Sequence, residues 1–502
     1  MHASRRQLVA AALTAPLFVR HATAADVARF EIGVASGQPR ADRLVLWTRL
    51  TGVDLPDRCS VQWELARDEA FADIAAQGSE LALVEDAHSV HAEPLDLEPA
   101  RWFWYRFTAL GQRSAVGRTR TAPAAQAPAT LAFAITSCQR WDQGHWAAWR
   151  ELAREPLDLV MFLGDYIYEY PSPASSPRHH DGGLVRNLQQ YRNRYAQYKS
   201  DPSLQAAHAA FPWLIIWDDH EVANDYAQLQ GESPGSDFAS QRAAAYKAWW
   251  EHMPVSHAMR PIGPDARIFG RWDWGRLARI HTLDDRQYRD LQACPPFARM
   301  GSNHVQRFDC AALDDPRRSL LGAAQERWLA EGWDLERPWN LLAQQTLMAR
   351  LSGMPVDGPS RGQFWTDGWD GYAPARQRLL TTAVDRGVRN LVVLGGDVHA
   401  HFVADLKTDF DDLKGPVVGS EFCGTSISSR GPSTSRIANA LPWNPHIHYG
   451  RPDRRGYVAF DLDEQRLQAR LMAVRDVMDP GSRLEMAARF VVLAGRPGPQ
   501  PA

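Results

Sequence analysis

The segment at residues 159–170 reads LVMFLGDYIYEY, an apolar run that ends in Gly-Asp and a tyrosine-rich turn. Short apolar runs of this kind are typical of strands that are buried on both faces of a parallel sheet. Three further runs end in a polar group: FAITSC at 133–138, LIIWDDHE at 214–221 and LVVLGGDVH at 391–399. Amphipathic stretches that predict helices alternate with these runs, at 145–155, 241–252 and 376–389. The pattern therefore predicts an α/β (α+β) fold.

Each of the four runs ends in a side chain that binds metals well, namely Cys138, Asp165, Asp219 or Asp397. Ligands of open α/β sheets bind outside the carboxyl ends of the strands, so we expect the four groups to point into one crevice. A single Asp after a strand is more often a turn residue or a helix cap. Several carboxylates in one crevice, however, would repel one another unless cations lay between them. The convergence therefore predicts a metal centre.

The spacing of the acidic motifs adds two further donors. Asp165 and Tyr168 are three residues apart, which on a helical turn brings the carboxylate and the phenol to the same side. Asp397 and His399 are two residues apart, and they face the same way on an extended strand. We therefore expect the phenol and the imidazole to lie beside the two carboxylates.

The chemistry of the donors then separates two kinds of ion. Thiolate, phenolate and imidazole suit a transition ion, so Cys138, Tyr168 and His399 predict a ferric iron site. The alternative for the cysteine is an inert buried thiol. Oxygen donors suit a harder divalent ion, and the sequence offers Asp219, Asn224 and Asp397 for it, with Asp165 as the bridge between the two sites.

The amino-terminal part of the chain has a different pattern. Short alternating segments, such as WFWYRF at 102–107, are separated by Gly, Pro and Asp turns. They predict a small β-sandwich of the immunoglobulin or fibronectin type at residues 28–122. The segment at 121–130 is rich in Pro and Ala and poor in packing groups, which indicates a domain boundary. The α/β catalytic unit would then occupy residues 130–490.

Residues 1–25 resemble a twin-arginine export signal, which carries folded proteins. Arg5 and Arg6 precede an apolar stretch at 8–19, and Ala-Thr-Ala follows at 22–24. The alternative is a frayed terminus with two arginines by chance. The apolar stretch is shorter than the ~20 residues needed to span a membrane. We therefore expect a periplasmic or secreted protein, handed over to the twin-arginine export machinery, without a transmembrane segment.

Charge and cysteine content agree with such a destination. The formal net charge of −3 leaves no basic footprint for a nucleic acid, so we expect no stable nucleic-acid binding. Cys294 and Cys310 bracket a segment with Pro, Gly, Ser and Asn, which predicts a surface loop closed by a disulfide. The alternative is two reduced thiols. Three cysteines remain without a partner: Cys59, Cys138 and Cys423.

Longer motifs occur in order along most of the chain. They are FEIGVASGQPRADRLVLWTRL at 30–50, SCQ at 137–139, GDYIYEY at 164–170, WDDHEVANDY at 217–226, LDDRQYR at 283–289, DGWDGY at 367–372 and GGDVHAH at 395–401. With these motifs the sequence resembles the PhoD-like alkaline phosphatases (alkaline phosphatase D) of the calcineurin-like metallophosphoesterase superfamily. The resemblance implies a β-sandwich followed by a calcineurin-like αββα metallophosphoesterase domain, with ferric iron (Fe3+) and two calcium ions (Ca2+) in the site.

The resemblance also implies which side chains hold the metals. Iron would be held by Cys138, Asp165, Tyr168 and His399, and calcium by Asp165, Asp219, Asn224 and Asp397. Two positions depart from the superfamily pattern. Its leading Asp-x-His is replaced by the cysteine motif, and its middle metal histidine has no counterpart near residues 340–345. The ligand that completes the second site is therefore left open.

The implied activity is hydrolysis of small-molecule phosphate esters by a metal-bound hydroxide, because two metals neutralise the phosphoryl oxygens and hold the reacting groups in line. We expect Asp165 to serve both sites. His220 would hydrogen-bond the phosphate or protonate the leaving alkoxide. Arg286 would clamp the oxygens bidentately, with a surface salt bridge to Asp284 or Asp285 as its alternative.

Two other functions stay open at this point. The same metal centre would serve a phosphodiesterase, including phospholipase D-like action on lipid headgroups. A non-enzymatic alternative is a secreted, calcium-stabilised binding module whose metal site is structural. Structural sites are fully ligated, whereas catalytic sites keep an open position.

Overall fold

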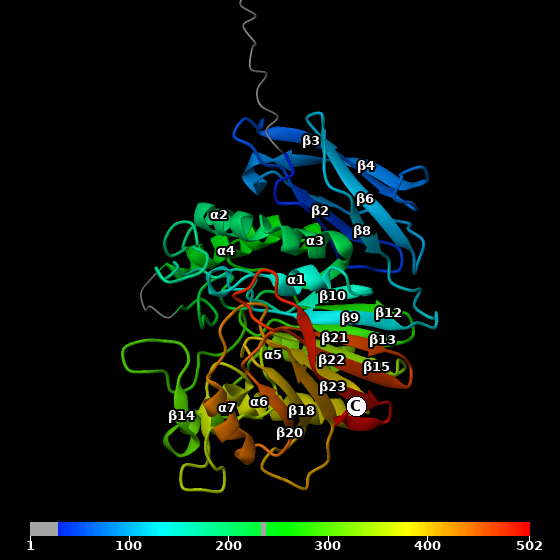
Figure 1. The fold of residues 1–502 in the computed structure, drawn as a ribbon. Helices are drawn as coiled ribbons and strands as arrows, with labels where there is room; N and C mark the ends of the chain where they lie inside the picture. The colour runs from blue at the N-terminus through cyan, green and yellow to red at the C-terminus, as the bar shows by residue number, and fades with distance from the viewer. Residues whose placement is uncertain (1–28, 232–236) are drawn as a thin grey trace, which may run out of the picture.

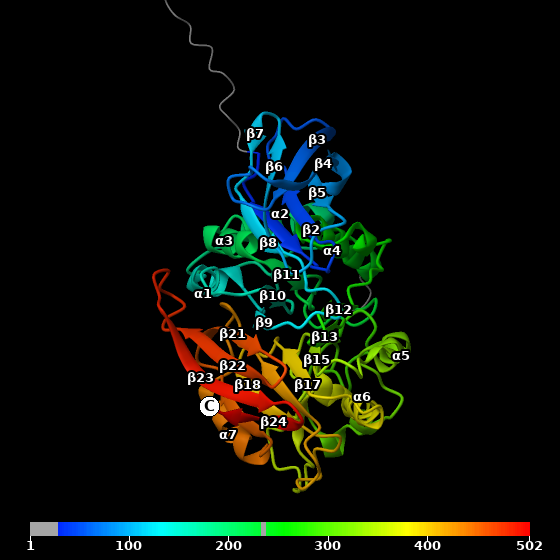
Figure 2. The ribbon, with the colours of Figure 1, turned by 90° about the vertical axis from the view of Figure 1, so that its right-hand side faces the viewer.

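The computed structural model describes residues 29–231 and 237–502 (Figure 1). Two large β-sheets lie face to face, helices cover their outer sides, and the amino-terminal strands sit beyond the first helical layer (Figures 1 and 2). The αββα prediction is confirmed. The predicted export signal at 1–25 lies outside the described residues. Within those residues, no helix has both the length and the apolar character that crossing a membrane requires.

The larger sheet has ten strands in the order β24-β23-β22-β21-β9-β10-β11-β1-β2-β5. Three of the predicted apolar runs form its parallel centre: β9 (Leu131–Thr136), β10 (Leu159–Phe162) and β11 (Pro212–Ile215). Antiparallel strands extend one side: β21 (Arg455–Leu462), β22 (Arg466–Val474), β23 (Leu484–Leu493) and β24 (Arg496–Pro501). Every residue of β10 and β11 is buried, as expected for strands covered on both faces.

The second sheet has seven strands in the order β12-β13-β15-β17-β19-β18-β20. Its strands are β12 (Gly270–Trp274), β13 (Ala278–Thr282), β15 (Trp339–Ala343), β17 (Leu391–Gly395), β18 (His401–Leu406), β19 (Gly419–Cys423) and β20 (Ile447–Arg451). The fourth predicted run is β17. Aromatic rings join the two sheets, because Phe460 stacks on Phe133 at 4.6 Å between centroids and meets Phe422 edge-on at 5.4 Å.

Helices form the two outer layers (Figures 1 and 2). Those beside the ten-stranded sheet are α1 (Ala147–Leu152), α2 (Leu188–Lys199), α3 (Pro202–Ala210) and α4 (Phe238–His252). Those beside the seven-stranded sheet are α5 (Gly322–Gly332), α6 (Ala373–Asp385) and α7 (Thr434–Ala440). The three predicted amphipathic stretches contain or overlap α1, α4 and α6. Side chains cap several of these helices, as Asn187 does for α2 in a capping box with Gln190.

The amino-terminal strands form two layers, of which one is continuous with the ten-stranded sheet. A five-stranded sheet contains β3 (Arg58–Ala66), β4 (Ile74–Leu83), β6 (Trp102–Ala109), β7 (Gln112–Arg113) and β8 (Gly117–Arg120). The facing layer is β1 (Val34–Gly37), β2 (Val45–Arg49) and β5 (Ser89–Ala92). Strand β1 pairs in parallel with β11, so this layer belongs to the ten-stranded sheet. The amino-terminal unit is therefore hydrogen-bonded to the parallel centre of the ten-stranded sheet.

The predicted disulfide between Cys294 and Cys310 is present. It closes a loop that contains β14 (His304–Gln306), which pairs with β16 (Gln363–Trp365) as a two-stranded sheet. The other three cysteines are buried and free, as expected from their number.

Trp47 on β2 anchors the amino-terminal layer to helices α2 and α4. Its side chain is fully buried against Ile32, Ala35 and Ala196, and its indole nitrogen donates to the Glu251 carbonyl at 3.1 Å. We predict that Trp47→Ala lowers the free energy of unfolding by about 3–5 kcal/mol, because it leaves a cavity and an unpaired carbonyl. Urea unfolding followed by circular dichroism measures this loss. Phe297→Ala, at a fully exposed aromatic residue, is the matched control and should change stability by less than about 0.5 kcal/mol.

Candidate metal centre

The turns that follow the strands place the predicted donors in an unusual backbone conformation. Cys138 follows β9, Asp165 follows β10, and Asp397 and His399 follow β17. All four have positive φ, at 58°, 59°, 62° and 53°. Such values are uncommon for residues with a Cβ and persist only where the surrounding structure enforces them. Glycine at position 164 allows the turn after β10 to lie close to Asp218, since a Cβ at this position would lie 2.3 Å from the Cβ of Asp218. The tightly packed strand ends therefore force these donors into the crevice.

The first group of donors consists of Cys138, Asp165 and His399, whose ligand atoms all lie within 4.8 Å of one another. Tyr168 joins them, because its hydroxyl donates to Asp165 Oδ2 at 2.6 Å and lies 3.2 Å from His399 Nε2. Ser429 Oγ donates to the same phenol oxygen at 2.8 Å. The predicted helical turn between Asp165 and Tyr168 is wrong, since residues 164–168 form an irregular segment that contains no helix. The carboxylate and the phenol meet nevertheless.

The second group consists of Asp165, Asp218, Asp219 and Asp397, again with all ligand atoms within 4.8 Å. Asp165 belongs to both groups, which is the position expected of a bridge. Asp397 and His399 belong to different groups. The predicted extended strand between them is wrong, because β17 ends at Gly395 and both residues have positive φ. Their side chains therefore serve neighbouring sites instead of one.

The donors of both groups suit metal ions. Asp165 Oδ1, Asp219 Oδ1 and Asp397 Oδ2 are buried and have no hydrogen-bond partner, which is costly unless a cation binds there. Burial, together with the charges of Asp219, Asp367 and Asp165, raises the pKa of Asp397 to about 8 despite the nearby Arg286. Burial and the charges of Asp165 and Asp397 also raise the pKa of the Cys138 thiol well above its usual value. These groups become good ligands once a cation compensates their charge.

Arg286 lies within the acidic crevice and is fully buried. Its Nε donates to Asp218 and its Nη1 to Asp367, while Nη2 lies 3.5 Å from both Asp219 and Asp397. The surface salt bridge considered for this residue is wrong. The carboxylates already occupy Nε and Nη1, so Nη2 alone remains for any contact with an anion.

The position that lacks the superfamily's middle histidine is occupied by glutamines with structural roles. Gln345 donates through Nε2 to the carbonyls of Trp217 and Leu283, at 2.8 and 3.0 Å, and its Oε1 accepts from the Asp285 amide at 3.2 Å. All its polar atoms are therefore engaged with the backbone. Positive charge reaches the second group of donors from Arg286 and from His220, whose ring lies with Asp165 and Asp219 in a further cluster of ligand atoms within 4.8 Å of one another.

Sequence reasoning missed Glu169, which holds His220. Glu169 Oε2 lies 2.7 Å from His220 Nδ1, and Oε1 accepts from the Asn224 amide at 2.7 Å. Although burial opposes it, the negative charge of Glu169, with those of Asp165 and Asp219, raises the pKa of His220 well above its usual value. The signal was present in the sequence, because Glu169 is the acid of the GDYIYEY motif. The bond fixes the imidazole and leaves Nε2 for a ligand.

The chain matches known proteins along most of its length. A family model described as PhoD-like phosphatase matches residues 133–471, and the model for the amino-terminal domain of PhoD-like phosphatases matches residues 15–123. Alkaline phosphatase D of Bacillus subtilis (strain 168) is 40% identical over 482 residues, which cover 92% of this chain and 80% of that protein. A solved structure of PhoD superposes with a TM-score of 0.88 at 39% identity, covering 94% of this chain and 92% of the other.

A more distant structure shares the fold alone. It is the purple acid phosphatase PPD1 from yellow lupin seeds, with a TM-score of 0.53 and 11% identity over 92% of this chain and 74% of that one. At this identity the likeness supports the calcineurin-like architecture only.

We predict that Asp165→Asn lowers the metal content of both groups of donors together, because Asp165 is the one carboxylate that the two groups share. The affinity for each metal should fall by more than about tenfold. Metal analysis by inductively coupled plasma mass spectrometry after dialysis measures both contents. The same substitution at Asp461, exposed on β21, is the control. A variant that keeps both metals would contradict the bridging position.

Proposed function

Because this chain belongs to the PhoD-like phosphatase family and is therefore a phosphoric ester hydrolase, we propose that it is an exported alkaline phosphatase with an iron and calcium centre. The observation that carries the proposal is the position of Asp165 between two donor groups of different chemistry. Export in the folded state by the twin-arginine route agrees with such a centre, since its ligands come together only in the folded chain.

In this proposal the softer donors hold ferric iron: Cys138, Asp165, Tyr168 and His399. The all-oxygen side of the crevice holds calcium, two ions in total, with Asp165, Asp219, Asn224 and Asp397 as ligands. The unpartnered oxygens of Asp165, Asp219 and Asp397 support this assignment. When bound, the metal ions supply positive charge for the phosphoryl oxygens and lower the pKa of a water molecule, so that hydroxide is available as the nucleophile.

The chain's own contribution to the chemistry centres on His220. Glu169 engages Nδ1 at 2.7 Å and stabilises the protonated imidazole, which leaves Nε2 to donate to a phosphoryl oxygen or to the departing alkoxide. The ring also lies against that of Tyr168, with 4.1 Å between centroids and a tilt of 33°, so it cannot turn freely. Groups placed in this way typically contribute about 10² to 10⁴ in rate.

Arg286 has a different part from the bidentate clamp that its motif predicts. With Nε and Nη1 bound to Asp218 and Asp367, it keeps these two acids in place and balances part of the negative charge in the crevice. Only Nη2 would reach a phosphoryl oxygen, as a single charge-assisted hydrogen bond. We therefore propose positioning as the main role of Arg286.

The two alternative functions, a binding module and a phosphodiesterase, are supported to different degrees. Membership of a phosphatase family argues against the calcium-stabilised binding module. Phosphodiesterase or phospholipase D-like action requires the same centre and is an outcome of the activity test.

We predict that the purified protein hydrolyses p-nitrophenyl phosphate, with loss of most activity after removal of iron and calcium by chelators and recovery when both are restored. The release of p-nitrophenol at alkaline pH measures this. Bis(p-nitrophenyl) phosphate, assayed in parallel, separates a monoesterase from a diesterase by the ratio of kcat/KM values. Full activity in protein shown to be free of both metals would overturn the metal-dependent proposal.

We predict that Glu169→Gln lowers kcat by about 10- to 100-fold. This loss is a part of the rate enhancement that His220 contributes as general acid. Loss of the nearest negative charge lowers the pKa of His220. The imidazole therefore loses its proton at a lower pH than in the wild type, and the activity should fall at that lower pH. A pH-rate profile measures this shift, and metal content should stay unchanged. Glu464→Gln, at a half-exposed acid paired with Arg276, is the control.

A further inference from the structure

A cavity of about 280 Å³ lies between β14 and β16 on one side and α7 on the other, and parts of its wall adjoin the donor residues in the chain. Apolar side chains make up much of its wall, including Leu347, Leu351, Trp365, Trp369, Val398 and Ile437. The bond between Arg436 on α7 and His304 on β14 joins the two sides, at 2.6 Å between Nη2 and Nε2. We call this cavity the Trp365 pocket.

The lining of the Trp365 pocket is continuous in the chain with the metal centre. Val398 stands between Asp397 and His399, one from each donor group. Gly368 directly follows Asp367, whose carboxylate groups with those of Asp219 and Asp225. Neighbouring Cα atoms are 3.8 Å apart, so these parts of the wall lie within one residue of the crevice.

The cation at the mouth of the pocket has no acidic partner. Among the described residues, no carboxylate lies within ion-pair distance of Arg436, and His304 is the ring that it contacts. The one acid in the wall, Asp370, is engaged by Arg376 at 2.7 Å and by the Leu351 amide at 2.9 Å. Arg436 is therefore free to bind an anion.

A buried hydroxyl in the wall also lacks a partner. Thr346 Oγ1 is buried and makes no hydrogen bond, although a group of this kind normally finds one. A Cβ at Gly368 would lie 3.0 Å from this oxygen, so glycine keeps the space beside it open. The pocket thus offers flat apolar walls, one hydroxyl inside and one uncompensated cation at its rim.

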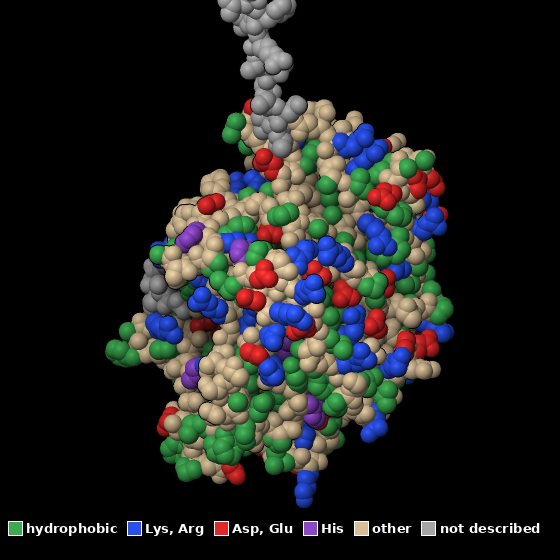
Figure 3. All heavy atoms as spheres, viewed as in Figure 1, with side chains coloured by type: hydrophobic (Ala, Val, Ile, Leu, Met, Phe, Trp, Pro, Cys, Tyr) green, Lys and Arg blue, Asp and Glu red, His purple; other side chains and the backbone are tan. Residues whose placement is uncertain are grey.

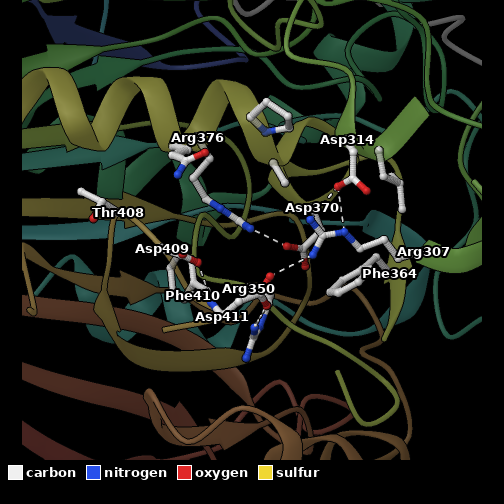
Figure 4. Close-up of a pocket in the computed structure, with 14 residues that line it drawn as sticks. Arg307, Asp314, Arg350, Phe364, Asp370, Arg376, Thr408, Asp409, Phe410 and Asp411 are labelled. Atoms are coloured by element: carbon white, nitrogen blue, oxygen red, sulfur yellow. Dashed lines mark hydrogen bonds and ion pairs between the residues drawn. The ribbon is translucent and has the colours of Figure 1, made fainter. Parts of the chain in front are cut away.

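A second cavity shows what an electrostatically satisfied pocket looks like in this protein (Figure 4). It contains Arg307, Arg350 and Arg376, which carry more positive charge than the Trp365 pocket. Each of the three is paired with an aspartate of the same cavity, such as Asp411 with Arg350 at 2.8 Å. The contrast makes the unpaired Arg436 the better anion site.

We propose that the Trp365 pocket binds the alcohol portion of the substrate, and that it favours a phosphate monoester of a flat aromatic alcohol that carries a carboxylate. This inference rests on the proposed phosphatase function. The aromatic ring packs between the apolar walls, and the carboxylate binds Arg436 by a charge-assisted hydrogen bond. The phosphate then reaches the metal centre from the side of Val398.

The test compares three monoesters: 4-carboxyphenyl phosphate, phenyl phosphate and methyl phosphate. We expect kcat/KM to be highest for the carboxyphenyl ester. Arg436→Gln should lower that value about tenfold, in line with the loss of one hydrogen bond to a charged group, and leave phenyl phosphate within about twofold. Arg483→Gln, at an exposed arginine outside the pocket, is the matched control and should change neither value.

A binding measurement separates this inference from the proposed function. Isothermal titration calorimetry with 4-hydroxybenzoate, the alcohol released from the first ester, should show binding to the wild type and about tenfold weaker binding to Arg436→Gln. If no ester is hydrolysed but this binding difference is found, the proposed function fails and the pocket stands. If esters are hydrolysed and Arg436→Gln alters neither the ester preference nor the binding, the pocket proposal is overturned.

Discussion

Buried negative charge is the constraint on which this structure depends. Asp165, Asp218, Asp219 and Asp397 bring their oxygens within 4.8 Å of one another in a crevice that excludes most water. Carboxylates in such a place must be protonated, paired or bound to cations. Arg286 and His220, whose pKa is raised well above its usual value, provide two positive charges for four acids, and several carboxylate oxygens have no hydrogen-bond partner. Further cations would compensate the remaining negative charge, in agreement with membership of a phosphatase family.

The same crevice requires a rigid frame. Four donor residues have left-handed backbone conformations that would relax in a free loop. Each follows a short, fully or almost fully buried strand, and the two sheets meet through the edge-on contact of Phe422 with Phe460. Because packed interiors yield little, the sheets impose these conformations on the turns. The positions of the donors are thus set by the core, many residues away from the chemistry.

The amino-terminal strands take part in this frame. Strand β1 pairs directly with β11, and Asp219 follows the end of β11 in the chain. Trp47 attaches the layer to the helices behind the sheet. The amino-terminal layer therefore extends the sheet that supports the site, and its stability bears on the geometry of the metal centre.

The sequence by itself determined the α/β class, the four strand ends that carry the candidate donors, the disulfide and the family, because apolar periodicity and long motifs are local properties that can be read along the chain. Only the tertiary structure decided that Glu169 holds His220, that Asp218 and Asp367 occupy two of the nitrogens of Arg286, and that Asp397 and His399 serve different donor groups. Spacing rules assume an ideal helix or strand, and they failed at the turns after β10 and β17. There the backbone conformation is imposed by packing between segments more than 50 residues apart, and no local pattern records such packing.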